Sequence, residues 1–266
     1  MPEACAFEVA AVSDAGTTRE ANEDHCAFVE LAPGSWLLAV ADGVSGFGAG
    51  ETASRMAVEG VLRAFREENE RVAAGKRLYR AVQKANIDVH DLALVVPELR
   101  GMATTLTAAL VDGGTLHAAH VGDSRLYRMR GGSLVQLTKD HTVVAERVRL
   151  GVLSRERARH HPDRSVLSRS LGRELIVSID QLTTELADGD VILLCSDGLY
   201  NVLSDGEMEE IVGARDAGAA CRALVDAANA RGTQDNLTAL VVRVVGPVPA
   251  PQKPPGLVDK LRRIFV

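Results

Sequence analysis

Two stretches of the chain repeat apolar residues at the spacing of an amphipathic helix. Residues 51–71 and residues 78–94 each place a stripe of apolar side chains on one helical face. The first stripe consists of Ala53, Met56, Ala57, Val61, Ala64 and Phe65, and the second of Leu78, Ala81, Val82, Ala85, Val89 and Leu92. Because an apolar stripe is stable only when it is buried, we expect two long helices that pack on a core.

Shorter apolar runs bounded by glycine-rich turns predict β-hairpins. The expected strand pairs are 104–111 with 115–121, around Asp112-Gly113-Gly114, and 124–129 with 133–137, around Arg130-Gly131-Gly132. Further strands are expected at 191–195 and 237–245. Strands and long helices come in blocks and do not alternate strictly. The pattern therefore favours an α+β fold in which helices cover antiparallel sheets.

The composition of the chain changes at Gly246. The segment 246–256 is rich in proline, which excludes a helix or a central strand. Beyond it, residues 257–266 would place Leu257, Leu261 and Ile264 on one face of a short basic helix. We therefore predict one folded domain, residues 1–246, followed by a proline-rich linker and a short basic amphipathic tail, residues 247–266. The tail is interpreted either as an unstructured terminus or as a segment that docks on a partner or an anionic surface.

Composition and charge argue against several classes of protein. Hydrophobic residues make up 46% of the 266 residues and charged residues 25%, which are ordinary values for a globular chain. A net charge of −6 and an aromatic content of 3% disfavour nucleic-acid binding, which relies on basic surfaces and aromatic stacking platforms. We find no apolar run of membrane-spanning length and no signal-peptide pattern, so we expect a cytoplasmic protein. The 4 cysteines have no Cys-x-x-Cys spacing, which argues against a zinc cluster or a disulfide framework.

Acidic residues stand at the exits of two apolar strands. Asp42 follows residues 36–41, Asp197 follows residues 191–196, and a glycine comes directly after each aspartate. A carboxylate in such a place is costly unless it is paired or bound to a cation. Asn22-Glu23-Asp24 and Gln234-Asp235-Asn236 supply further carboxylates. Oxygen ligands without a Cys or His cluster favour hard cations such as Mg²⁺, Mn²⁺ or Ca²⁺.

The alternative interpretation is that these acids are solvated turn residues, since Asp-Gly is first of all a turn signal. Three other Asp-Gly pairs fit that interpretation. Asp112 lies in a hairpin turn, Asp188 precedes a strand, and Asp205 follows Ser204, which has capping-box spacing to Glu207. Patterning alone does not decide between a metal site and turns at Asp42 and Asp197.

Seven motifs in order along residues 8–245 resemble the type-2C metal-dependent protein serine/threonine phosphatases (the PPM family), in their bacterial branch. They are Ser13-Asp14-x-Gly16-x-x-Arg19-x-x-Asn22-Glu23-Asp24, Ala41-Asp42-Gly43-Val44-Ser45-Gly46, Gly101-Met102-Ala103-Thr104-Thr105-Leu106, Val121-Gly122-Asp123-Ser124-Arg125-Leu126-Tyr127, Leu137-Thr138-Lys139-Asp140-His141, Ser196-Asp197-Gly198-Leu199 and Asp235-Asn236-Leu237-Thr238. The resemblance implies a four-layer α-β-β-α sandwich, with two antiparallel sheets flanked by helix pairs and a two-metal site at one end.

The resemblance also implies roles for single residues. Asp42 corresponds to the carboxylate that bridges both metal ions, and Gly43 to the residue that offers a carbonyl oxygen. Asp197 and Asp235 correspond to ligands of one of the two ions. Asp42 and Arg19 are therefore the implied catalytic residues.

The remaining acids correspond to the other metal positions. Glu23 and Asp24 resemble the acids that hold the second ion, partly through water. Asp123 resembles the ligand of a third, weaker ion, which it shares with Asp197. Arg19 matches the arginine that binds the substrate phosphate, a role that suits the planar fork of a guanidinium.

The implied activity is hydrolysis of phosphoserine and phosphothreonine in proteins. Mn²⁺ or Mg²⁺, two ions per site with a third weaker one, would activate a bridging hydroxide for attack on phosphorus. No covalent phosphoenzyme is implied, which agrees with the absence of a Cys-x5-Arg signature. The implied partners are phosphorylated proteins, the targets of a serine/threonine kinase, and we expect a monomer that binds no nucleic acid.

Two other functions compete with this one. The first is a non-catalytic module that binds phosphoproteins on the same fold, and it would require a broken metal set, whereas Asp24, Asp42, Asp197 and Asp235 are all present. The second is a regulatory domain in which the tail and a flap matter more than turnover.

The sequence departs from the family pattern at Val44. Eukaryotic members place a histidine directly after the Asp-Gly pair, as a proton donor to the leaving alkoxide. We name a metal-bound water as the first candidate for this donor and His25 as the second, although a packed or surface histidine is the commoner explanation for His25. His141 opens the segment 142–172, which forms a flap over the site in relatives.

Overall fold

The computed structural model describes residues 6–44, 49–246 and 248, and they fold around two five-stranded antiparallel sheets. The first sheet has the order β1 (Ala6–Asp14), β10 (Leu237–Val245), β9 (Val191–Cys195), β6 (Arg125–Arg130) and β7 (Ser133–Gln136). The second has the order β2 (Asp24–Ala32), β3 (Ser35–Asp42), β4 (Leu106–Asp112), β5 (Thr115–Val121) and β8 (Asp180–Glu185). Strands that are neighbours in a sheet are often distant in sequence, as β1 and β10 are.

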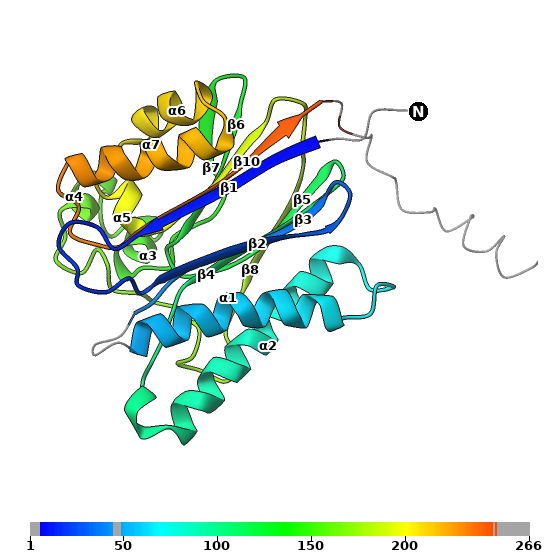
Figure 1. Ribbon diagram of the computed structural model, residues 1–266. Helices are drawn as coiled ribbons and strands as arrows, with labels where there is room; N and C mark the ends of the chain where they lie inside the picture. The colour runs from blue at the N-terminus through cyan, green and yellow to red at the C-terminus, as the bar shows by residue number, and fades with distance from the viewer. Residues whose placement is uncertain (1–5, 45–48, 247, 249–266) are drawn as a thin grey trace, which may run out of the picture.

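Helices cover the outer face of each sheet (Figure 1). The second sheet packs against α1 (Ala49–Glu67) and α2 (Ala74–Val95), and the first against α6 (Asp205–Gly213) and α7 (Ala217–Ala230). The shorter helices are η1 (Pro97–Leu99), α3 (Val143–Arg149), α4 (Arg155–Arg159) and α5 (Asp197–Tyr200). The four-layer α-β-β-α sandwich expected from the sequence is confirmed.

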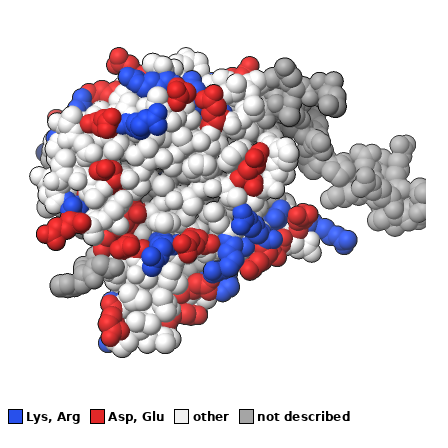
Figure 2. Space-filling model, viewed as in Figure 1, with Lys and Arg blue, Asp and Glu red and all other residues white. Residues whose placement is uncertain are grey.

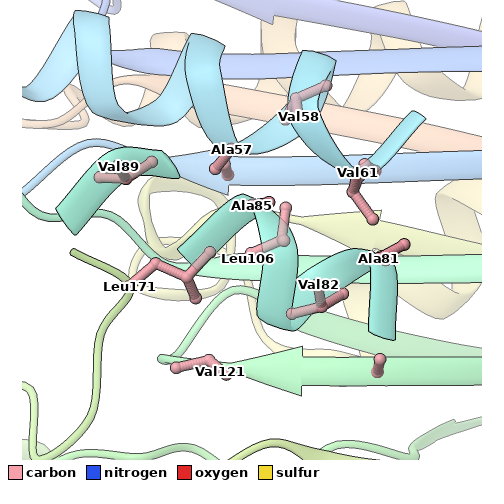
Figure 3. Close-up of a cluster of buried hydrophobic side chains, with 14 of the residues drawn as sticks. Ala57, Val58, Val61, Ala81, Val82, Ala85, Val89, Leu106, Val121 and Leu171 are labelled. Carbon is pink, nitrogen blue, oxygen red and sulfur yellow. The ribbon is translucent and has the colours of Figure 1, made fainter. Parts of the chain in front are cut away.

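Three apolar clusters hold the four layers together. The cluster between α1, α2 and the second sheet includes Val58, Val61, Val82, Leu106 and Val121 (Figure 3). The cluster between the two sheets includes Leu38, Val40, Ile192, Leu194 and Leu240. The cluster under α6 and α7 includes Leu193, Met208, Cys221, Leu224 and Val241. Alternate residues of β3, β9 and β10 thus enter different clusters, as the two faces of a strand require.

The register of the strands brings distant parts of the chain to one end of the sandwich. Asp24, the first residue of β2, pairs with Asp42, the last residue of β3. Asp14 ends β1 opposite Leu237, which begins β10. In Figure 1 the loop between β1 and β2, helix α5 and the segment with α3 and α4 all lie at the left end of the sandwich.

Charged residues of both signs are interspersed over the face shown in Figure 2. No extended field of a single sign covers the described residues on this face. None of the helices in residues 6–44 and 49–246 combines the length and the hydropathy needed to cross a membrane. The linker and tail that we predicted lie outside the described residues, apart from Val248.

Candidate metal and phosphate site

Asp42 is held through its backbone at the end of β3. Its N–H donates to Thr105 Oγ1 at 2.9 Å, and its carbonyl oxygen accepts from Thr105 N at 2.9 Å and from Thr104 Oγ1 at 2.8 Å. Ser124 lies 2.6 Å from the Thr105 hydroxyl. Two threonines of the segment 101–106 therefore fix the backbone of Asp42. Positioning this aspartate is the structural role of that motif.

Asp24 lies beside Asp42 and beneath the strand ends of the other sheet. Directly paired residues of antiparallel strands project from the same face, so register places these two carboxyl groups together. One oxygen of Asp24, Oδ2, accepts from Ser196 Oγ at 2.6 Å and from Thr238 Oγ1 at 2.7 Å. The hydroxyls come from the exit of β9 and the start of β10, so Asp24 joins the two sheets.

Asp197 and Asp235 meet at the end of the first sheet, because β9 ends where β10 begins. A Cβ on Gly198 would lie 2.1 Å from the carbonyl oxygen of Asn236, so only glycine permits this approach. Asn201 donates to Asp197 Oδ2 at 3.0 Å. The glycine after Asp197 therefore does more than form a turn.

Arg19 lies at the rim of the same site. Its Nε donates to the carbonyl oxygen of Gln234 at 3.0 Å, and its Nη2 lies 3.0 Å from Asp235 Oδ1 and 3.1 Å from Oδ2. About half of the side chain remains exposed, at 52%. The guanidinium is thus oriented by two partners while part of it remains available to a ligand.

These residues line one pocket of about 350 Å³. The lining consists of Arg19, Glu23, Asp42, Gly43, Val44, Asp123, Ser165, Leu167, Asp197, Asp235 and Asn236. Of the metal and phosphate ligands expected from the sequence, only Asp24 is absent from the lining, since it is buried. Ser165, Leu167 and Asn236 were given no role from sequence. Asn236 stands inside a quoted motif, whereas only the resemblance to a flap pointed to the segment that contains Ser165 and Leu167.

Burial and mutual repulsion make the carboxylates costly in their charged form. Burial, followed by the charges of Asp24 and Asp197, raises the pKa of Asp42 well above its usual value. Burial and the charge of Asp197 do the same to the pKa of Asp123. Burial raises the pKa of Asp24 to about 7 and that of Asp197 to about 6. Bound cations would remove this cost.

Two buried carboxylate oxygens lack a hydrogen-bond partner in the described part of the chain. Asp24 Oδ1 and Asp197 Oδ1 are inaccessible to solvent and have no hydrogen-bond partner among the described residues. Unpartnered buried carboxylate oxygens are rare unless they meet a water or an ion. An oxygen-only donor set of this kind fits hard divalent cations such as Mn²⁺ and Mg²⁺.

The carboxylates do not form a closed cage. Within the described residues, no group of three or more His, Cys, Asp or Glu side chains is arranged to hold a metal ion by itself. Mg²⁺ characteristically keeps several waters and binds through one or two carboxylates. The open arrangement therefore fits cations that retain part of their water shell.

Glu23 is placed by the start of α1. Burial raises its pKa, while Arg19 and the backbone N–H of Gly50 oppose that rise. A Cβ on Gly50 would lie 2.8 Å from Glu23 Cδ and 2.9 Å from both carboxylate oxygens. A Cβ on Gly43 would lie 2.3 Å from the Gly50 carbonyl oxygen. Gly50 thus leaves the space that the Glu23 carboxylate occupies.

We expect Gly50→Ala to displace the Glu23 carboxylate and to weaken Mn²⁺ binding by about 10- to 100-fold, the usual effect of disturbing a group beside a metal ligand. Alanine favours a helix more than glycine does, so thermal stability should not fall. Isothermal titration with Mn²⁺ and thermal unfolding in EDTA measure the two effects. Gly206→Ala is the matched control, because a Cβ there meets nothing within 4 Å. Equal Mn²⁺ affinity in the two variants would contradict the placement of Glu23.

Asp123 enters the pocket from the turn after β5. Tyr200 donates to its carbonyl oxygen at 3.0 Å, and the N–H of the preceding Gly122 donates to His141 Nδ1 at 3.1 Å. Gly122 has φ = 107°, and a Cβ there would lie 2.5 Å from Thr105 Cβ. The turn is therefore fixed on both sides of Asp123.

The candidate histidine, His25, does not reach the pocket, and neither does His141. His25 follows Asp24 in β2, so it projects from the opposite face, and the charges that act on it are Glu59, Arg55 and Glu51 of α1. His141 is buried beside Gly122, and its ring centroid lies 4.7 Å from that of His120 in a tilted pair. No histidine appears among the described residues that line the pocket. His25, the second candidate for the proton donor, thus lies away from the site.

Comparisons with known proteins agree with this architecture. The sequence profile of the protein phosphatase 2C family matches residues 16–241. The serine/threonine phosphatase Stp of Listeria monocytogenes is 37% identical over 234 residues, which are 86% of this chain and 93% of that protein. The crystal structure of the Mycobacterium tuberculosis serine/threonine phosphatase PstP superposes with a TM-score of 0.82 at 36% identity, covering 90% of this chain and 99% of that one.

A structure of the PstP catalytic domain in complex with 2 manganese ions is also similar. Its TM-score is 0.79 at 35% identity, and the match covers 90% of this chain and 99% of that one. A helix-covered sandwich of two antiparallel sheets, with a carboxylate-rich pocket at one end, defines the class of the type-2C phosphatases. The chain belongs to the protein phosphatase 2C family of serine/threonine phosphatases, in its bacterial branch.

Proposed function

We propose that the chain hydrolyses phosphoserine and phosphothreonine in proteins with the help of Mn²⁺ or Mg²⁺. One observation carries the proposal: a half-exposed arginine and five carboxylates line a single pocket of about 350 Å³. Cations would attract the phosphate dianion that the carboxylates by themselves repel. The names of the bacterial relatives support the same activity.

Arg19 would bind the phosphate of the substrate. Its guanidinium is held by Gln234 and Asp235, and an oriented planar fork binds two phosphate oxygens at little further cost in entropy. Its ion pair with Asp235 is exposed, so it contributes little stability and can be exchanged for a ligand.

The residues that would hold the cations are Glu23, Asp24, Asp42, Asp123, Asp197 and Asp235, with the carbonyl oxygen of Gly43. Bound divalent cations would supply positive charge to the phosphate oxygens and lower the pKa of a water that they share. Asp42 pairs with Asp24 in the register of β2 and β3, and the charges of Asp24, Asp197, Asp123 and Asp235 all raise its pKa. Its fixed backbone keeps the set in place without reorganisation.

The leaving alkoxide would take its proton from water. Val44 stands in the pocket wall where a histidine would be placed, and it has no proton to give. The pocket is partly open to solvent, and its lining includes Ser165 and Leu167 of the segment 142–172. An imidazole that acts as a general acid contributes about 10²- to 10⁴-fold to the rate. Because Val44 cannot supply this contribution, we expect the hydrolysis rate to fall more steeply for poor leaving groups than for good ones.

We further propose that residues 1–246 form the catalytic unit. Every residue assigned here lies between Arg19 and Asn236, and β10 ends at Val245. Phosphorylated proteins made by a serine/threonine kinase, a monomeric state, a cytoplasmic location and a docking role for the tail remain predictions.

Hydrolysis of p-nitrophenyl phosphate tests the function. We expect turnover that requires Mn²⁺ or Mg²⁺, that stops in EDTA and that returns when the ion is added in excess. A phosphothreonine peptide should release inorganic phosphate under the same conditions. A protein that binds Mn²⁺ and the peptide but releases no phosphate at any metal concentration would instead be a phosphoprotein-binding module.

A further inference from the structure

A second cavity, of about 500 Å³, opens beside the carboxylate pocket. It shares four lining residues with that pocket, Arg19, Ser165, Asp197 and Asp235. The rest of its wall comes from Gly198, Asn201 and Val202 after β9, from residues 232–234 before β10, and from Arg164. A peptide whose phosphorylated residue occupies the first pocket can therefore extend across the second.

Of the two arginines that line the second cavity, one has no carboxylate partner among the described residues. Of the two carboxylates in this cavity, Asp235 pairs with Arg19, and Asp197 accepts from Asn201 through Oδ2 and has Oδ1 left for a bound cation. The side chain of Arg164 forms no ion pair with another described residue. Other arginines of the segment 142–172 do, since Arg147 pairs with Asp163 and Arg169 with Asp180.

Arg164 is presented by an ordered turn. Its N–H donates to the carbonyl oxygen of His161 at 3.1 Å, and Val166 N donates to the Asp163 carbonyl oxygen at 3.1 Å. The turn is then tied to the start of α3, where Val143 N donates to the Val166 carbonyl oxygen at 2.9 Å. A pre-organised backbone lowers the entropy cost of binding at this arginine.

We propose that this cavity is a subsite for an acidic side chain of the substrate, and that Arg164 determines the preference for it. The acidic residue would lie within three residues of the phosphorylated serine or threonine. A carboxylate and a second phosphate present the same chemistry, because each accepts a bidentate pair of hydrogen bonds from a guanidinium. The inference rests on the proposed function, since it adds a second contact for the same substrate.

Steady-state kinetics on phosphothreonine peptides test the subsite. The peptides carry neutral flanks, or one aspartate at each of three positions on either side, or one phosphoserine at the same positions. We expect one position at which aspartate lowers KM by roughly fivefold to tenfold, the size of a charge-assisted hydrogen bond in a partly solvated site. A gain with phosphoserine but not with aspartate would assign the subsite to a second phosphate.

Variants distinguish a role of Arg164 in substrate preference from a role in the hydrolysis step. Arg164→Ala should remove the gain from the acidic residue, while Arg155→Ala, at an exposed arginine of α4 outside the cavity, should keep it. Arg164→Glu should instead prefer a lysine at the same position. Neither Arg164→Ala nor Arg164→Glu should alter kcat/KM for p-nitrophenyl phosphate, because this substrate has no flanking residues.

The outcomes distinguish the two proposals. If the parent hydrolyses p-nitrophenyl phosphate but gains equally from acidic flanks with and without Arg164, the subsite is wrong and the activity stands. If the parent hydrolyses neither compound with Mn²⁺ present, the proposed activity fails first.

Discussion

Asp42→Asn is expected to lower kcat for p-nitrophenyl phosphate in Mn²⁺ by roughly a thousandfold, and to raise the thermal stability of the metal-free protein. The loss follows because Asp42 is the carboxylate on which four neighbouring acids act, and the removal of one central electrostatic group commonly costs about 10²- to 10³-fold or more. The gain follows because asparagine fills the same space without a charge that burial and its neighbours penalise.

The gain in stability should be visible as a rise in Tm of at least about 2 °C in EDTA, which roughly 1 kcal/mol produces in a chain of this size. The backbone bonds of Asp42 to Thr104 and Thr105 do not involve its carboxyl group, so the substitution leaves them intact. In saturating Mn²⁺ the order should reverse, because the wild-type chain then gains more binding energy. Asp226→Asn, at an exposed position of α7, is the control and should change neither quantity. A lower Tm for Asp42→Asn in EDTA would contradict the repulsion that we infer.

Arg19→Ala is expected to lower kcat/KM for a phosphopeptide by about 100-fold, the order that the loss of a charge-assisted phosphate contact produces. Much of the effect should appear in KM, and inhibition by inorganic phosphate should weaken in parallel. Affinity for Mn²⁺ should not fall, because the substitution frees Asp235 from its ion pair. This separates a phosphate-binding role from a role in holding the metal.

Arg19→Lys should recover only a small part of the lost kcat/KM. The guanidinium uses Nε for Gln234 and Nη2 for Asp235, and a single ammonium group cannot make both contacts and still present two donors to phosphate. Arg63→Ala is the matched control, since Arg63 is an exposed arginine of α1 that has one carboxylate partner, Asp88, and does not line the pocket. Full activity of Arg19→Ala would remove Arg19 from the site.

The parts of the fold that follow from local pattern could be predicted from the sequence. The apolar stripes gave α1 and α2 within about a turn at most ends. The first helix ends at Glu67 and not at residue 71, because Asn69 begins a turn in which its side chain accepts from Arg71 N. The capping box at Ser204 and Glu207 is present as predicted. Asp112 ends β4 directly before the hairpin turn of Gly113 and Gly114, and Asp188 lies in a turn.

Other elements were not assigned from pattern. Strands β1, β2 and β8 are edge strands in which nearly every residue is half-buried or exposed, so none of them carries a buried apolar run. Helix α7 is rich in alanine, which gives little contrast between its faces. Without β2, the period of two that separates Asp24 from His25 could not be applied, and His25 remained a candidate for the proton donor.

For the candidate site, sequence reasoning identified single residues but not their arrangement. The position of an aspartate at the exit of an apolar strand singled out Asp42 and Asp197, although the pattern alone did not decide between a metal site and a turn. The pairing of Asp24 with Asp42, and the space that Gly50 leaves for Glu23, depend on register and on close approach between distant segments. Such contacts cannot be predicted from the spacing of residues along the chain.

Anomalous diffraction from crystals soaked in Mn²⁺ tests the central claim most directly. The account predicts at least two strong anomalous peaks in the pocket formed by Glu23, Asp42, Asp197 and Asp235, and their loss in Asp42→Asn crystals treated in the same way. Crystals of hydrolytically active protein that show no anomalous peak in this pocket at saturating Mn²⁺ would contradict it.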